Sequence, residues 1–100
     1  MNKVAFEIAL ANRDIHTTTE LSDITGISRQ TLTAIRNNIG EASQESAEQI
    51  RITLKLSNKE YIEIFPMQAE ITAVKEKYLL GSNELYTLIH PEVNYELSKN

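Results

Sequence analysis

The side chains best suited to recognising another molecule are gathered in one short stretch: Ser28, Arg29, Gln30, Thr33 and Asn37. Arginine can donate two parallel hydrogen bonds to a guanine edge, and glutamine pairs with adenine in the same bidentate way. Each good contact of this kind contributes roughly 1 to 3 kcal/mol to discrimination between bases. Side chains of these types can form hydrogen bonds with base edges or with phosphate, and Arg29 and Gln30 are the first choices for base contacts.

A second group of polar side chains flanks this stretch and is suited to binding phosphate: Thr17, Thr18, Arg36 and Asn38. Hydroxyls and free amides at a helix start can hold a phosphate oxygen with help from the helix dipole. Such contacts position a protein on a duplex without reading its sequence. Thr17 also has a structural explanation, because with Glu20 it has the spacing of a capping box. Arg36 is equally suited to an ordinary surface ion pair.

No arrangement of residues points to catalysis, a metal or a cofactor. The chain has no cysteine, and His16 and His90 are far apart with no second ligand at a suitable spacing beside either. There is no nucleophile elbow or phosphate-binding glycine loop, and capping and turns explain the many Ser and Thr residues. We therefore expect no enzymatic activity, no cofactor and no bound metal.

The composition favours one small helical domain. A chain of 100 residues that is 41% hydrophobic can bury a small core without a staple. Only three Gly and two Pro occur, and Ala, Leu, Glu, Lys and Gln are frequent, so we expect helices and no sheet. No apolar run is long enough for a signal peptide or a membrane span, which, with the absence of cysteine, predicts a cytoplasmic protein with no membrane partner.

The net charge of −4 and the isoelectric point near 5.1 are opposite to what phosphate binding over the whole surface would require. Residues 1–56 carry six basic and seven acidic side chains, whereas residues 57–100 carry four basic and seven acidic ones. Most of the excess acid therefore lies in the second half. A DNA-binding protein needs positive charge on one face only, and Arg29 and Arg36 would supply it there.

Residues 2–13 have the 3.6-residue periodicity of an amphipathic helix. One face of this helix carries Val4, Ile8 and Ala11, with Ala5 and Ala9 beside them. We expect this apolar face to contact the rest of the protein.

Residues 18–37, TTELSDITGISRQTLTAIRN, predict two short helices joined by a tight turn. Gly26 ends the first helix because glycine adopts a left-handed backbone freely, and Ser28 caps the second. Small Ser22 lets the two backbones approach closely. The apolar wedge between the helices is expected to consist of Leu21, Ile27, Leu32 and Ile35. This crossing projects the second helix from the surface, where its N-terminal end can enter a major groove.

Further helices are predicted after a loop at residues 38–42. Ser43 or Ser46 can cap a helix that turns Ala47, Ile50 and Leu54 inward, and Ser57 with Glu60 begins a brief helix carrying Tyr61, Ile64 and Phe65. Two more apolar stripes follow, one of Ile71, Val74 and Tyr78 ending at Gly81, and one of Leu85, Leu88 and Ile89 ending at Pro91. They serve either to dock on the preceding helices or to dimerise. Residues 94–100 have no periodic pattern and are expected to fray.

Over residues 2–65 the chain resembles the Cro and phage repressor family, also called the XRE or lambda-repressor-like helix-turn-helix family. The resemblance rests on LSDITGISRQTLTAI in the two short helices and on AEQIRITLKLSNKEYIEIF after the loop. It implies an all-α fold with a five-helix DNA-binding domain at residues 1–66 and a helical C-terminal extension at residues 67–100, a possible dimerisation element. Two positions depart from the family pattern: Thr25 is usually apolar, and Arg51 is often small.

The resemblance implies a sequence-specific transcriptional regulator, of the repressor kind found in phages and mobile elements, that binds a pseudo-palindromic operator in double-stranded DNA as a homodimer. Carried over by position, the DNA-binding residues are Thr17, Thr18, Ser28, Arg29, Gln30, Thr33, Arg36, Asn37 and Asn38. The alternative is a helix-turn-helix module, a modulator or antirepressor, that binds another regulatory protein. The acidity of the second half favours this alternative.

Overall fold

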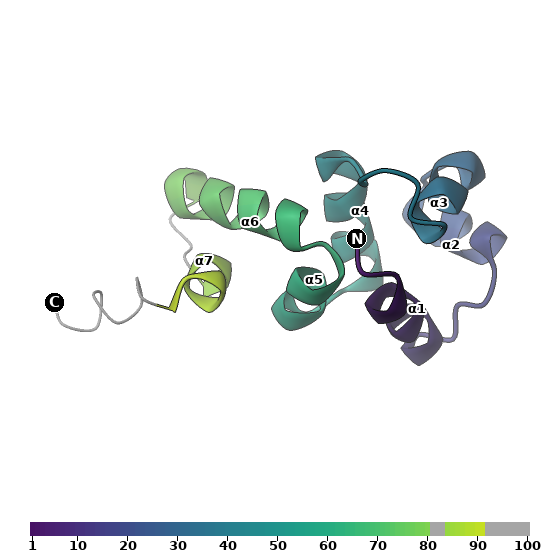
Figure 1. Cartoon of the computed structure of the whole chain (residues 1–100), viewed down its shortest axis with the longest axis horizontal. Helices are drawn as coiled ribbons and strands as arrows, with labels where there is room; N and C mark the ends of the chain where they lie inside the picture. The colour runs from purple at the N-terminus through teal and green to yellow at the C-terminus, as the bar shows by residue number, and fades with distance from the viewer. Residues whose placement is uncertain (81–83, 92–100) are drawn as a thin grey trace, which may run out of the picture.

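The computed structural model describes residues 1–80 and 84–91, and within them every regular element is helical (Figure 1). The elements are α1 (Lys3–Asn12), α2 (Thr18–Thr25), α3 (Arg29–Arg36), α4 (Gln44–Leu54), α5 (Asn58–Ile64), α6 (Pro66–Lys75), a π-helical turn η1 (Glu76–Leu80) and α7 (Glu84–Ile89). The expected all-α class is confirmed for this part of the chain.

The helices divide the molecule into two ends. Figure 1 shows α1 to α5 gathered at one end, with α2 and α3 furthest from the C-terminal helices. Helix α6 extends away from this group, and α7 packs beside it. Helix α3, which is expected to contact DNA, therefore lies at one end of the molecule. The C-terminal helices lie at the other end.

Aromatic side chains form the centre of the core. Phe6, Tyr61 and Phe65 are completely buried, and the Phe65 ring centroid lies 5.9 Å from that of Phe6 and 6.1 Å from that of Tyr61. Tilted and edge-on contacts at these separations are the favoured geometries for aromatic pairs. The same core continues into the C-terminal helices through Ala69, Ala73 and Leu85. Residues 1–66 and the described part of the extension thus share one core.

The apolar face expected for α1 is buried only at its edge, where Ala9 is buried and Ala5 packs partly against the core. Val4 and Ile8 are 69% and 55% exposed, and Ala11 is exposed too. The buried side chains of α1 are Phe6, Ala9 and Leu10. These residues also have helical spacing, and burying Phe6 and Leu10 removes more apolar surface from water than burying Val4 and Ala11 would.

The N-termini of α2 to α5 are capped by side chains, as expected. The hydroxyls of Thr17, Ser28, Ser43 and Ser57 each accept a hydrogen bond from the amide three residues on. Ser57 and Glu60 complete a reciprocal capping box. At Thr17 only half of the box forms, because the Glu20 carboxylate accepts from the amide of His16 instead.

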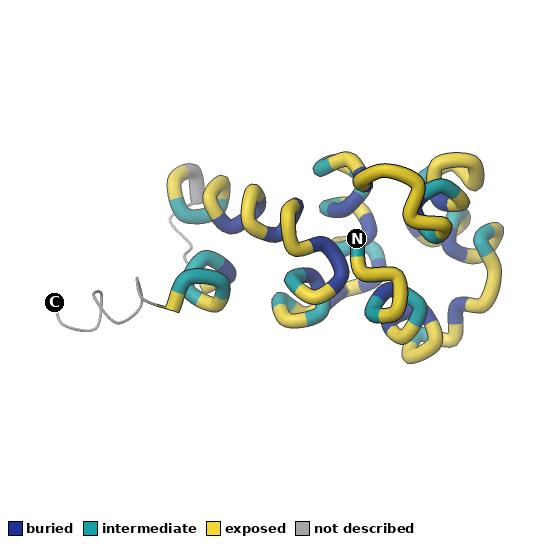
Figure 2. The backbone as a smooth tube through the Cα atoms, viewed as in Figure 1, coloured by how far each residue is buried: buried dark blue, intermediate teal, exposed yellow. Residues whose placement is uncertain are grey.

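The C-terminal stripes fall on different surfaces. Ile71, Val74 and Tyr78 are exposed, whereas Leu85 is buried and Ile89 packs partly against the core. Leu88 is exposed as well. Figure 2 shows buried and exposed positions alternating along α6. The expected stop at Gly81 and the fraying of residues 94–100 lie outside the described residues.

Arg13, which ends α1, joins three helices through its guanidinium. Nε donates to the Leu54 carbonyl at 2.7 Å, and Nη1 donates to the Ala9 carbonyl at 3.0 Å. Nη1 and Nη2 also donate to the two carboxylate oxygens of Glu60 at 2.9 and 2.8 Å. This bidentate pair, aided by the Ser57 amide, lowers the pKa of Glu60 to about 2.

The Arg13–Glu60 pair makes stability depend on acid. Because the pKa of Glu60 is below its ordinary 4.5, the stabilisation is complete above about pH 4.5 and is lost as the pH falls toward 2. We expect Glu60→Gln to lower the free energy of unfolding at pH 7 by about 1 to 2 kcal/mol. Urea unfolding at a series of pH values, with exposed Glu63→Gln as the control, measures this. An unchanged acid dependence in Glu60→Gln would contradict it.

Candidate nucleic-acid interface

The turn between α2 and α3 is fixed by a left-handed glycine and two hydroxyls. Gly26 has φ of 74° and ends α2. The Ser22 hydroxyl donates to the Ile27 carbonyl at 2.6 Å. The Thr25 hydroxyl donates to the Leu21 carbonyl at 2.8 Å and accepts from the Ile27 amide at 3.2 Å. Thr25 is buried, and these two hydrogen bonds satisfy its hydroxyl there.

The expected wedge between α2 and α3 is largely confirmed. Leu21 and Leu32 are fully buried, Ile35 is buried, and Ile27 is half-buried against the core. The Gln49 side chain of α4 donates to the Thr25 carbonyl at 3.1 Å and so ties the end of α2 to the rest of the fold. These contacts hold α3 at a fixed angle to α2.

Gly26 is required for its backbone conformation rather than for space. A Cβ added there would meet no atom within 4 Å. We expect Gly26→Ala to lower the free energy of unfolding by about 1 kcal/mol, the lower end of the penalty for a left-handed alanine. Gly26→Asn should lower it less, because asparagine tolerates this conformation. Urea unfolding measures both variants, and equal stability of Gly26→Ala and the unsubstituted protein would contradict the assignment.

The outward face of α3 is polar along its whole length. Arg29, Gln30, Thr33 and Asn37 are all exposed, while Leu32 and Ile35 on the opposite face are buried. These four side chains, which were expected to contact bases or phosphate, therefore share one exposed surface. The segment from Ser28 to Asn38 contains two arginines and no acidic residue.

Three other predicted site residues also have structural roles or unusual backbones. Thr17 caps α2, and Ser28 caps α3 while its hydroxyl donates to the Thr31 hydroxyl at 2.9 Å. Asn38 is exposed in the loop after α3, with a left-handed φ of 57°. Asparagine is one of the few residues that adopt this conformation routinely.

A polar hollow of about 270 Å³ lies between α1, α2 and α3. It brings together four of the predicted site residues, namely Thr18, Thr33, Arg36 and Asn37. Two further lining residues, Lys3 and Glu7, come from α1 and were missed by the sequence analysis. Their positions on α1 carry no local signal, because only the fold brings α1 beside α3.

Arg36 is held in this hollow by two partners. Its Nε and Nη2 donate to the two carboxylate oxygens of Glu7 at 3.1 and 2.8 Å. Its Nη1 donates to the Thr18 hydroxyl at 3.1 Å. The hydrogen bonds from Arg36 hold the pKa of Glu7 below its ordinary value. Lys3 adds a second positive charge, so the hollow carries two cations against one carboxylate.

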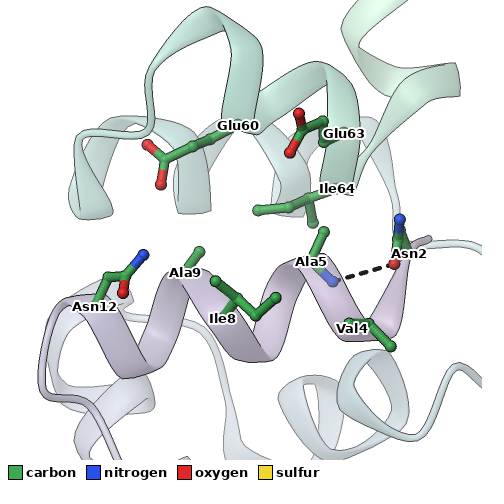
Figure 3. Close-up of a pocket in the computed structure, with 9 residues that line it drawn as sticks. All are labelled: Asn2, Val4, Ala5, Ile8, Ala9, Asn12, Glu60, Glu63 and Ile64. Atoms are coloured by element: carbon green, nitrogen blue, oxygen red, sulfur yellow. Dashed lines mark hydrogen bonds between the residues drawn. The ribbon is translucent and has the colours of Figure 1, made fainter.

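A larger hollow of about 390 Å³ lies between α1 and α5 (Figure 3). We call it the α1/α5 groove. Its apolar wall includes Val4, Ile8 and Ile64, and the carboxylates of Glu60 and Glu63 come from the α5 side. None of the residues expected to contact DNA lines this groove.

Residues 1–80 and 84–91 include no helix that is both long and apolar enough to span a membrane. Within the same ranges, no three His, Asp or Glu side chains converge to form a potential metal site. No protein family matches the chain, and no curated protein or solved structure matches it at a significant level.

Proposed function

We propose that this chain is a sequence-specific DNA-binding transcriptional regulator, with α1 to α5 forming a lambda-repressor-like domain and α3 entering the major groove. The observation that carries the proposal is the division of α3 into two faces. Leu32 and Ile35 hold the helix on α2, while Arg29 and Gln30 remain exposed near its N-terminal end. That is where recognition helices contact base edges. The proposed role involves no catalysis, cofactor or metal.

The polar hollow beside α3 suits a backbone phosphate. Arg36 and Lys3 supply positive charge, and Thr18 supplies a hydroxyl at the first position of α2. Charge-assisted hydrogen bonds to a phosphate would fix the orientation of α3 on the duplex. Thr18 and Arg36 would therefore position the protein, and Arg29 and Gln30 would read the sequence.

The acidity of the whole chain is compatible with this role. The positive charge lies on and beside α3, where residues 28–38 carry no acidic side chain. A net charge of −4 weakens non-specific attraction to DNA, so specific contacts must supply most of the affinity. We propose that two copies bind a pseudo-palindromic operator, as the sequence resemblance implies.

Removing a base contact and removing a phosphate contact should have different effects. We expect Arg29→Ala or Gln30→Ala to lower affinity for the preferred duplex by roughly 1 to 3 kcal/mol and to relax the preference at one base pair. Thr18→Ala should weaken binding to all sequences by a similar factor. Selection from a random duplex library, followed by affinity measurements, tests this, with Lys59→Ala on α5 as the control for loss of charge. An equal loss on every sequence for Arg29→Ala would exclude base recognition by Arg29.

Glu7 competes with phosphate for Arg36. We expect Glu7→Gln to tighten binding to any duplex, because the charge of Arg36 is then no longer neutralised by a carboxylate. The dependence of log K on log salt should become steeper by up to about one unit. Base preference should stay the same. Titrations at several salt concentrations measure the slope, and Glu63→Gln is the matched control. An unchanged slope and affinity in Glu7→Gln would show that Arg36 does not contact phosphate.

A second candidate is a protein-binding module that acts on another regulator. The α1/α5 groove favours it, because Val4 and Ile8 are exposed there beside the carboxylate of Glu63. Such a groove suits the apolar face of a basic helix. No enriched DNA sequence, together with a stable complex with another regulator that is lost in Ile8→Glu, would favour this candidate.

A further inference from the structure

Four large apolar side chains form an exposed stripe along α6 and η1: Met67, Ile71, Val74 and Tyr78. We call it the α6 stripe. Its members are between 40% and 74% exposed. Their spacing of 4, 3 and 4 residues is that of the seam between paired helices. A surface helix normally turns such a seam toward the core.

The opposite side of α6 is held in place by polar contacts, so the stripe cannot rotate inward. The buried Gln68 side chain donates to the Ala42 carbonyl at 2.6 Å. The buried Thr72 hydroxyl accepts from the Gln44 side chain at 2.7 Å and lies 3.0 Å from the Tyr61 hydroxyl. Turning the helix would break these bonds and leave buried polar groups unpaired.

Ion pairs on the side of the stripe nearest α4 fix the helix without covering it. Lys75 pairs with Glu48 at 3.1 Å, and Glu76 pairs with Arg51 at 3.1 Å. Arg51 also lies over the Tyr61 ring, 5.2 Å from its centroid. Arg51, one of the two departures from the family pattern, is thus explained by the docking of α6 and η1.

The other side of the stripe faces α7 and carries Glu70 and Lys77. Glu70 pairs with His90 at 3.0 Å, and its side chain remains 53% exposed. The Lys77 ammonium lies 4.3 Å from the centroid of the Tyr86 ring. Among the described residues Lys77 has no acidic partner. One acidic and one basic side chain therefore flank the same edge of the stripe, about two turns apart.

We propose that the α6 stripe binds the α6 stripe of a second copy of this chain, in antiparallel orientation about a two-fold axis. In this pairing Ile71 faces Val74 of the second copy, and Met67 faces Tyr78. The same edge of the stripe in each copy then lies next to its counterpart in the other copy, so Glu70 contacts Lys77 of the second copy. The surface is self-complementary in both apolar pattern and charge, as a two-fold interface requires.

The proposed interface rests on the proposed function in one respect: a pseudo-palindromic operator is bound by two copies of the protein. Helix α3 lies at the other end of the chain from α6 (Figure 1). Antiparallel pairing therefore carries the two α3 helices to opposite ends of the dimer. Half-site centres should be more than one helical turn, about 34 Å, apart. One short helix pair buries less than about 1,200 Å², so the dimer should be weak and reversible.

Sedimentation of the full chain without DNA, from about 1 µM to about 500 µM, tests the association. We expect a reversible shift from monomer to dimer, weakened at least about tenfold by Ile71→Glu. Ile24→Glu, at an exposed apolar residue of α2 far from α6, is the matched control and should dimerise normally. Urea unfolding checks that both variants are folded. A chain that is monomeric throughout, or Ile24→Glu weakening dimerisation as much as Ile71→Glu, would overturn the proposal.

A charge exchange tests the antiparallel orientation. Glu70→Lys should weaken the dimer, and adding Lys77→Glu in the same chain should restore it. Restoration by Lys75→Glu instead would overturn the antiparallel pairing, because that pair is formed by parallel helices. Both dimerisation experiments are done without DNA, so their results do not depend on the proposed DNA binding. If the protein is a monomer that still selects a single half-site, the proposed dimer is wrong and the proposed function stands. If it is a dimer that selects no DNA sequence, the proposed function is wrong and the dimer stands.

Discussion

The fixed crossing of α2 and α3 is the constraint on which the proposed site depends. Gly26 supplies a left-handed turn, and Leu21, Leu32 and Ile35 fill the space between the two helices. Because α3 uses its whole apolar face in this contact, its polar face must point outward. Since α3 is only eight residues long, packing rather than intrinsic propensity keeps it helical. A change that loosened the turn would therefore alter the direction of the exposed side chains as well as stability.

Local signals in the sequence predicted much of the fold. The caps at Ser28 and Ser57, the turn at Gly26 and the inward stripe of α4 depend on residues within one or two turns of each other. The buried face of α1 was only partly predicted, because two overlapping sets of residues had helical spacing and only the position of the aromatic core selects between them. Four of the six residues that line the polar hollow were predicted site residues. Lys3 and Glu7 were not, because they reach the hollow through the packing of α1, which leaves no local pattern.

In the C-terminal helices, too, contacts between residues distant in sequence decide which face is buried. Apolar periodicity alone would turn Ile71 and Val74 toward the core, yet α6 buries Gln68 and Thr72 instead. Bonds to the Ala42 carbonyl and Gln44 offset part of the desolvation of these polar groups, while Oε1 of Gln68 is buried without a hydrogen-bond partner. Both bonding partners are more than 20 residues away in sequence. The consequence is an apolar stripe left on the surface beside a shared core. Such a stripe is an unusual feature for a monomer.

DNA recognition by α3 is tested most directly by mapping the DNA contact on the protein with amide chemical shifts. Isotope-labelled protein would be titrated with a duplex taken from a selected pool, at roughly physiological salt. We expect the largest shifts in residues 28–37, which include α3, and at the start of α2 around Thr18, with smaller ones near Lys3. Shifts confined to the α1/α5 groove or to α6, or no shifts with any duplex, would contradict DNA recognition by α3.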